Sequence, residues 1–151
     1  MIEQELARNL REFIKDVVKD FRLPVETEKK ARAPKVYDGY LPPKRSEKGD
    51  DFPLIIVRPE SATSDREETE VSVAIIVGCY TEEFDGHEYC LNVMTRIRNA
   101  LASMENGVLA KKYVLKFPIT WNIVPEQPWP QWELEIDTKW CFNTPQAISD
   151  F

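Results

Sequence analysis

The chain has 151 residues, of which 42% are hydrophobic, 30% charged and 11% aromatic. This length suits one domain, and the composition excludes disordered and collagen-like proteins because it supplies enough apolar surface for a core. The formal net charge is −6, and residues 51–151 hold 8 basic against 16 acidic residues, a balance that repels phosphate and disfavours general nucleic-acid binding.

The first predicted element is a helix over residues 2–22. Apolar residues recur there at spacings of three and four with charged residues between them, and Pro24 follows the end of the pattern. This spacing is typical of an amphipathic helix with one face toward a core. Residues 27–51 then hold three prolines and two glycines among many charges, which predicts an extended arm or long loop.

Two β-strands and a second helix are predicted in the middle of the chain. Residues 52–59 and 69–80 are apolar and rich in β-branched side chains, and the polar segment between them predicts a hairpin turn. Asp85 and Glu88 have the spacing of a capping box, in which each side chain caps a backbone N–H of the other residue. An apolar stripe follows, so we expect a helix that ends at Gly107.

The last two predicted strands, residues 112–124 and 132–142, complete a sheet. In the first strand the apolar side chains, Phe117 among them, share one face, and Pro118 indicates an edge position or a bulge. In the second strand a mostly apolar series that includes Thr138 alternates with a mostly charged series that includes Cys141. This strand therefore has one face toward the core and one wet, acidic face.

These elements, in the order α-β-β-α-β-β, predict an α+β fold. Strand pairs joined by hairpins imply a mostly antiparallel sheet with helices packed chiefly on one face. We expect residues 1–151 to form a single domain with the extended arm at about 27–51. The first residues mix both charge signs and no apolar run approaches the length of a membrane span, so we expect neither a signal peptide nor contact with a membrane.

Enzymatic chemistry would depend on His87, the only histidine. A Ser-His-Asp or Cys-His arrangement would have to use it, with Asp85, Glu88 and Cys90 as its sequence neighbours. A place in the first turn of a helix favours an exposed His87, and Cys90 beside an apolar stripe favours an inert core thiol. The sequence therefore predicts no catalytic residue, while a small cytosolic enzyme or regulator that uses His87 stays open as an alternative.

Metals and cofactors are not expected either. Glu82, Glu83, Asp85 and Glu88 offer carboxylates to a divalent cation, but their spacing is not that of an EF-hand loop and favours a solvated turn. The five glycines are not clustered, so one loop cannot cradle a phosphate. The three cysteines are odd in number and widely spaced, which favours reduced thiols over a disulfide framework or a zinc site.

Candidate contact residues lie in the arm, where aromatic and proline side chains are interleaved with basic ones. The residues predicted to form an oligomer or partner interface are Tyr37, Tyr40, Leu41, Pro42, Pro43 and Lys44. Such a mixture can bind nucleic acid, or it can dock a proline-stiffened arm onto a neighbouring subunit. In an acidic protein we favour the contact with protein.

A second contact candidate is Trp129, in the proline-rich segment 125–132. Tryptophan on an exposed turn is a common anchor at interfaces. Trp132 is in phase with the core face of the last strand, which leaves Trp129 as the predicted contact.

Four segments of the chain together resemble one protein family. They are VYDGYLPPK, DFPLIIVRP, VSVAIIVGCYTEEFDGHEYCLNVMTRIRNAL and FPITWNIVPEQPWPQWELEIDTKW. Over about residues 34–142 the chain is similar to the tail terminators, also called tail-completion or minor tail proteins, of tailed bacteriophages and prophages. The resemblance implies a structural virion protein, a small α/β domain that forms a ring, usually hexameric, on the upper end of the tail tube. The ring stops tube growth and offers a surface for head-tail joining.

The resemblance also implies partners and a location. The partners are further copies of the chain, the tail tube protein and the head-tail connector protein, in the neck of a virion assembled in the bacterial host cytoplasm. Genomic DNA would pass through the lumen without specific binding. Another neck component, such as a head-closure or head-tail joining protein, is the alternative function.

The acidic face of the last strand has a candidate role in such a ring. Glu133, Glu135 and Asp137 would line the lumen, where like charge lets DNA slide without sticking. A plain solvated outer face is the alternative, because antiparallel sheets commonly leave one face wet.

Overall fold

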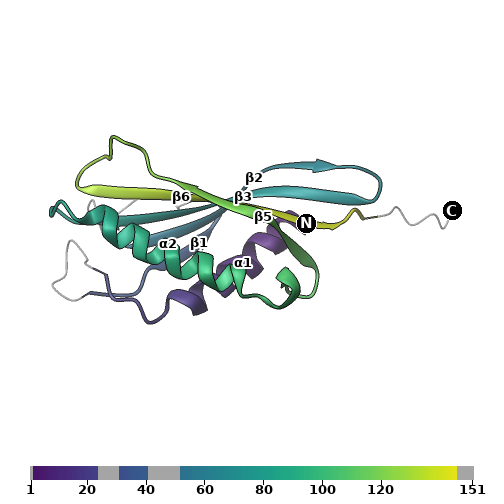
Figure 1. The fold of residues 1–151 in the computed structure, drawn as a ribbon, viewed down its shortest axis with the longest axis horizontal. Helices are drawn as coiled ribbons and strands as arrows, with labels where there is room; N and C mark the ends of the chain where they lie inside the picture. The colour runs from purple at the N-terminus through teal and green to yellow at the C-terminus, as the bar shows by residue number, and fades with distance from the viewer. Residues whose placement is uncertain (1, 24–30, 41–51, 146–151) are drawn as a thin grey trace.

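A computed structural model describes residues 2–23, 31–40 and 52–145. These residues form two long helices and a six-stranded sheet (Figure 1). The elements in chain order are α1 (Ile2–Val18), β1 (Lys35–Asp38), β2 (Leu54–Ser64), β3 (Glu68–Tyr80), α2 (Gly86–Ala102), the 3-10 turn η1 (Glu105–Gly107), β4 (Val108–Leu109), β5 (Tyr113–Asn122) and β6 (Gln131–Asn143). Within the described ranges, neither helix is long and apolar enough to cross a membrane.

The strands form one curled sheet in the order β1-β2-β3-β6-β5-β4. Strands β1 and β2 are parallel, and the other neighbours are antiparallel. The prediction of a mixed fold that is mostly sheet is confirmed, but the predicted order α-β-β-α-β-β is wrong because it lacks β1 and β4. These strands have four and two residues, too few to show the alternation by which a strand is predicted.

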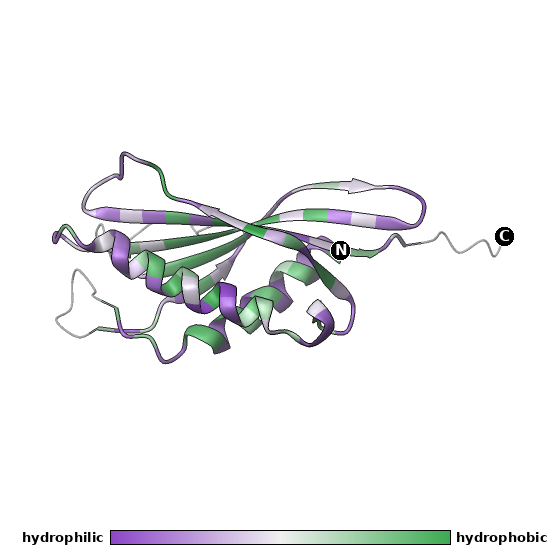
Figure 2. Cartoon of the chain, viewed as in Figure 1, coloured by the Kyte–Doolittle hydropathy of each residue, from purple (hydrophilic) through white to green (hydrophobic). Residues whose placement is uncertain are grey.

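Both helices cover the same face of the sheet (Figure 1), with α1 against β1 and β2 and α2 against β3 and β6. Figure 2 shows the alternation of hydrophobic and hydrophilic residues along the strands that this one-sided cover requires. The helices and the inner face of the sheet share one buried apolar cluster. Its fully buried members include Leu6, Leu10, Ile14, Ile55, Ile75, Val93, Ile97, Leu134, Ile136 and Trp140.

Part of the expected arm is the edge strand β1. Lys35 aligns with Leu54 of β2, and Arg11 of α1 donates a hydrogen bond to Asp38 at 2.6 Å. Gly39 then ends the strand at φ +84°, a conformation that glycine adopts without steric cost. Residues 35–38 of the expected arm therefore belong to the sheet, and Asp38 is tied to α1.

Both helices are shorter than predicted. Helix α1 ends at Val18 instead of residue 22, and Phe21 beyond it packs under the Arg96 guanidinium, 4.7 Å from the ring centroid. Helix α2 ends at Ala102, and Gly107 instead closes the 3-10 turn at φ +67°. In both cases the apolar pattern continues past the helix because the residues after it still pack on the core.

The predicted capping box of α2 is wrong. Asp85 is the residue before the helix, as expected, but its side chain makes no capping hydrogen bond. The backbone N–H of Glu88 instead donates to the backbone carbonyl of Asp85 at 2.9 Å. The first turn is therefore closed by the backbone.

Strands β2 and β5 differ from the predicted strands. Strand β2 continues to Ser64, so most of the expected hairpin turn is paired strand whose polar side chains are exposed. In β5 the register shifts between Lys116 and Thr120, which confirms a bulge at Pro118. The bulge leaves Phe117 62% exposed, so its predicted place on the apolar face is wrong.

Candidate functional site

The face of the sheet that neither helix covers carries the predicted acidic residues. Glu133, Glu135 and Asp137 alternate along β6 with the buried residues Leu134 and Ile136, and all three acids are half-buried. Strand β6 lies between β3 and β5, so these acids lie in the middle of the open face. We call this surface the open face.

Three carboxylates meet on the open face. Oxygen atoms of Glu60, Glu135 and Asp137 lie within 4.8 Å of one another. Glu60 reaches the other two from β2, at a register shift between Pro59 and Ser61. Burial, and then the charges of Asp137 and Glu60, raise the pKa of Glu135 above its ordinary value. The cluster thus concentrates negative charge at one point of the sheet.

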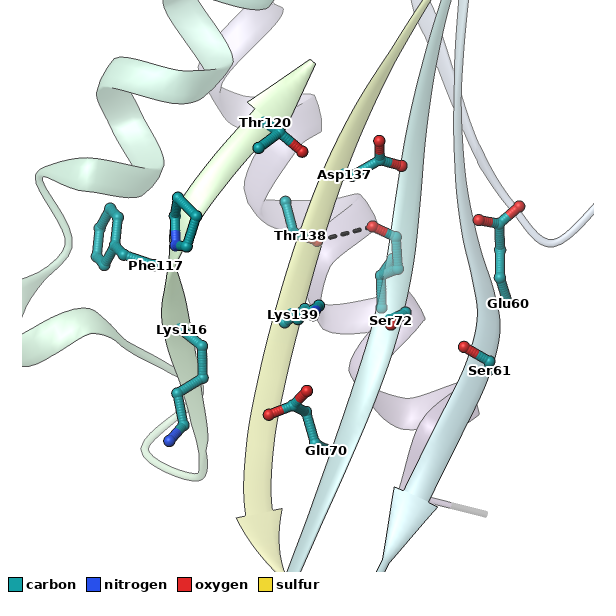
Figure 3. Close-up of a pocket in the computed structure, with 12 residues that line it drawn as sticks. Glu60, Ser61, Glu70, Ser72, Lys116, Phe117, Thr120, Asp137, Thr138 and Lys139 are labelled. Atoms are coloured by element: carbon teal, nitrogen blue, oxygen red, sulfur yellow. Dashed lines mark hydrogen bonds between the residues drawn. The ribbon is translucent and has the colours of Figure 1, made fainter. Parts of the chain in front are cut away.

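A groove of about 700 Å³ runs beside this cluster (Figure 3). Its lining joins Glu60 and Asp137 to Lys116 and Lys139, which face each other across β5 and β6. In Figure 3 the dashed line is the hydrogen bond from the Thr138 hydroxyl to the carbonyl of Val73, at 2.8 Å. The open face is therefore acidic in its middle and carries two lysines toward one end.

Sequence reasoning found Glu135 and Asp137 but missed Glu60. Alternation along one strand predicts which of its own residues share a face. Glu60 lies on a different strand, where it shares the face of Ile56 and Arg58, and only the pairing of β2 with β3 and of β3 with β6 brings it beside Glu135 and Asp137. No local pattern in the sequence indicates which strands become neighbours.

The predicted contact residues of the arm are only partly described. Tyr37 in β1 is half-buried and packs against the small apolar cluster of Phe52 and Tyr80. Tyr40 is 74% exposed, and the Arg58 guanidinium lies 4.1 Å from its ring centroid. The other four predicted contacts lie outside the described residues, and they are Leu41, Pro42, Pro43 and Lys44.

Trp129 lies on a turn at one end of the sheet, next to an aromatic residue that the sequence analysis did not select. The rings of Trp129 and Phe84 stack with centroids 6.5 Å apart and an angle of 25° between planes. Trp129 is 52% exposed and Phe84 is 82% exposed. We call these two side chains the aromatic pair. A single exposed phenylalanine in a polar turn gives no sequence signal of such a partner.

The structure does not bring His87 and Cys90 together. His87 is exposed at the start of α2, while Cys90 is fully buried. The Cys90 thiol lies 3.5 Å from the Cys79 sulfur and 3.5 Å from the backbone oxygen of Trp132. Among the residues with described positions, the acids of the 82–88 turn also form no group close enough to share a cation.

Comparisons with known proteins identify no family for this chain. The chain matches no protein-family model, and it has no match among curated proteins.

Proposed function

We propose that this protein is a tail terminator of a tailed bacteriophage or prophage. In this proposal, six copies assemble as a ring on the upper end of the tail tube. The ring offers a surface to the head-tail connector protein. The observation that carries this proposal is the acidic open face, together with the resemblance of residues 34–142 to that family.

The open face suits the lining of a channel for DNA. A sheet face that neither helix covers can line a channel, and Glu133, Glu135, Asp137 and Glu60 give the middle of that face a negative charge. Phosphates that pass within about 10 Å of these carboxylates are repelled, because that is the distance over which salt leaves charges unscreened. DNA would therefore slide along this face without binding.

The first experiment measures self-assembly. Native mass spectrometry and negative-stain microscopy of the purified protein test for rings of about 106 kDa, six times the 17.6 kDa of one chain. We expect rings with a central hole wide enough for a DNA duplex, either free or on added tail tubes. A protein that stays monomeric in solution and leaves tube ends bare would contradict the proposal.

A second experiment separates the terminator from a head-closure protein. Tails assembled in a host that makes no heads should contain the terminator, because it acts on the finished tube. A head-closure protein should be missing from them. Mass spectrometry of such purified tails decides between the two.

A third experiment tests the lumen assignment. The triple variant Glu133→Lys, Glu135→Lys, Asp137→Lys should assemble into virions but lower DNA ejection or infectivity by at least about tenfold, because basic side chains hold phosphate. The matched control changes three exposed acids of the helix side, Glu12→Lys, Asp20→Lys and Glu105→Lys. Equal infectivity of the two folded variants would place the open face outside the lumen.

A further inference from the structure

The aromatic pair exposes two large apolar rings to solvent at one place on the surface. Phe84 and Trp129 are 82% and 52% exposed, and their rings stack against each other in the open. Contiguous exposed apolar surface marks binding sites, whereas single exposed apolar residues are ordinary. Tryptophan in particular is enriched among the few residues that dominate binding energy.

Hydrogen bonds hold the aromatic pair in place. The Trp129 indole N–H donates to the Glu82 carbonyl at 3.3 Å, and the backbone N–H of Thr81 donates to the Pro130 carbonyl at 3.0 Å. The Trp132 indole N–H also donates to the Thr81 carbonyl, at 3.0 Å. The loops on either side of the pair are thus joined to each other. A surface that is already ordered loses less entropy when a partner binds.

The surroundings of the aromatic pair are acidic. Glu82, Glu83 and Glu126 lie next to or between its two members in the sequence and are exposed. Residues 80–90 and 117–138, which include both loops, contain no lysine or arginine. The surface therefore favours a basic partner, which its charge would also steer into place.

The chain itself contains a segment with the complementary chemistry. Residues 29–48 hold seven lysine and arginine residues against two acids, and residues 41–45 are LPPKR. Proline-rich segments dock on exposed aromatic side chains in an extended form, and lysine and arginine next to the prolines can pair with carboxylates. Residues 41–45 lie outside the described part of the structure. Their sequence alone shows that they complement the aromatic pair and the acids around it.

We propose that the aromatic pair is the docking site for residues 41–45 of a second copy of this chain. The two prolines lie against the rings, and the two basic residues pair with the acids around them. Each copy then donates one segment and accepts another, a head-to-tail contact that can close into a ring. This inference rests on the proposed function and deepens it, because it names the contact that joins the subunits.

A binding experiment tests the site directly. A fluorescent peptide of residues 38–48 is titrated into the full-length variant Lys44→Glu, Arg45→Glu, whose own segment cannot compete. We expect the peptide to bind, and the further change Trp129→Ala to lower its association constant at least about tenfold. The matched control is Phe117→Ala, which removes another exposed aromatic ring and should leave binding unchanged. Absence of binding, or equal binding to the Trp129→Ala protein, would overturn the inference.

A mixing experiment tests whether the two surfaces meet between copies. The Trp129→Ala protein keeps the segment but lacks the site, and the Lys44→Glu, Arg45→Glu protein keeps the site but lacks the segment. By analytical ultracentrifugation each should stay monomeric alone, and the mixture should form one-to-one dimers. A mixture without dimers, as expected if the segment docks within its own chain, would overturn the inference.

The outcomes separate this inference from the proposed function. If both variants form rings as well as the wild type does, the contact is wrong while the ring stands. If the peptide binds and the mixture dimerises but tail tubes are never capped, the contact stands and the terminator function fails.

Discussion

The indole ring of Trp132 lies so close to Gly86 that a Cβ atom on this glycine would overlap the ring. Gly86 is the first residue of α2, and Trp132 is near the start of β6. The absence of a side chain at Gly86 therefore lets the first turn of α2 approach the sheet. The same approach places the loop with Phe84 beside the turn that carries Trp129.

Gly86→Ala should destabilise the protein by about 1–3 kcal/mol, because the new methyl group must displace a packed ring. Urea unfolding followed by circular dichroism measures the change. The control is Glu88→Ala at an exposed position in the same turn of α2, which should change stability by no more than about 0.5 kcal/mol. Equal midpoints for Gly86→Ala and the wild type would show that the ring can move aside.

Much of the sheet could be predicted because its long strands alternate. In β6 every second residue from Trp132 to Phe142 faces the helices, and the sequence shows that apolar period at every position except Thr138. Strand β1 could not be predicted in this way. It has four residues, and its place depends on Leu54 of β2 and on the Arg11–Asp38 ion pair, contacts made only in three dimensions.

The candidate sites show the same division. Glu135 and Asp137 follow from the period of one strand, whereas Glu60 joins them through the pairing of β2 with β3 and of β3 with β6. Trp129 was predicted from its proline-rich turn, whereas Phe84 became its partner through the hydrogen bonds between two distant loops. Sequence patterns thus indicate single members of a surface, and tertiary pairing supplies the others.

The three cysteines should react slowly in the folded protein. All of them are buried, and burial and then the nearby Glu68 raise the pKa of Cys141 to about 11 from its ordinary 9.0. A shift of that size lowers the reactive thiolate fraction about 100-fold. A chromogenic disulfide reagent at neutral pH should therefore label the protein quickly only after denaturation. Fast labelling of one thiol in the native protein would contradict this prediction.

Glu135→Gln should stabilise the protein at neutral pH. The pKa of Glu135 is raised by burial and by the charges of Asp137 and Glu60, so the folded state binds the proton more tightly than the unfolded state does. Proton binding at Glu135 contributes its full stabilisation of the fold below the ordinary pKa of 4.5. This contribution is lost as the pH rises through the higher pKa of the folded state. Because the residue is only half-buried, solvent weakens the effect, and we expect a gain of about 0.3–1 kcal/mol.

The measurement for Glu135→Gln is urea unfolding at several values between pH 4 and pH 7. The gain should be present at pH 7 and should shrink toward pH 4, where the wild-type carboxyl is protonated. Glu133→Gln is the matched control, since Glu133 lies on the same face of β6 but outside the cluster of three carboxylates. A gain of equal size in the control, or one that does not depend on pH, would contradict the assigned cause.

Thr138→Val should cost stability although the two side chains have nearly the same shape. The Thr138 hydroxyl donates to the Val73 carbonyl at 2.8 Å and accepts from the Trp140 indole N–H at 2.9 Å. Thr138 is 2% exposed and Trp140 fully buried, so valine leaves the indole N–H without an acceptor, at a cost of about 1–3 kcal/mol. Thr138→Ser keeps the hydroxyl and loses one methyl group, which costs about 0.8 kcal/mol. Urea unfolding compares the two variants, and a valine variant at least as stable as the serine variant would show that the hydrogen bonds contribute nothing.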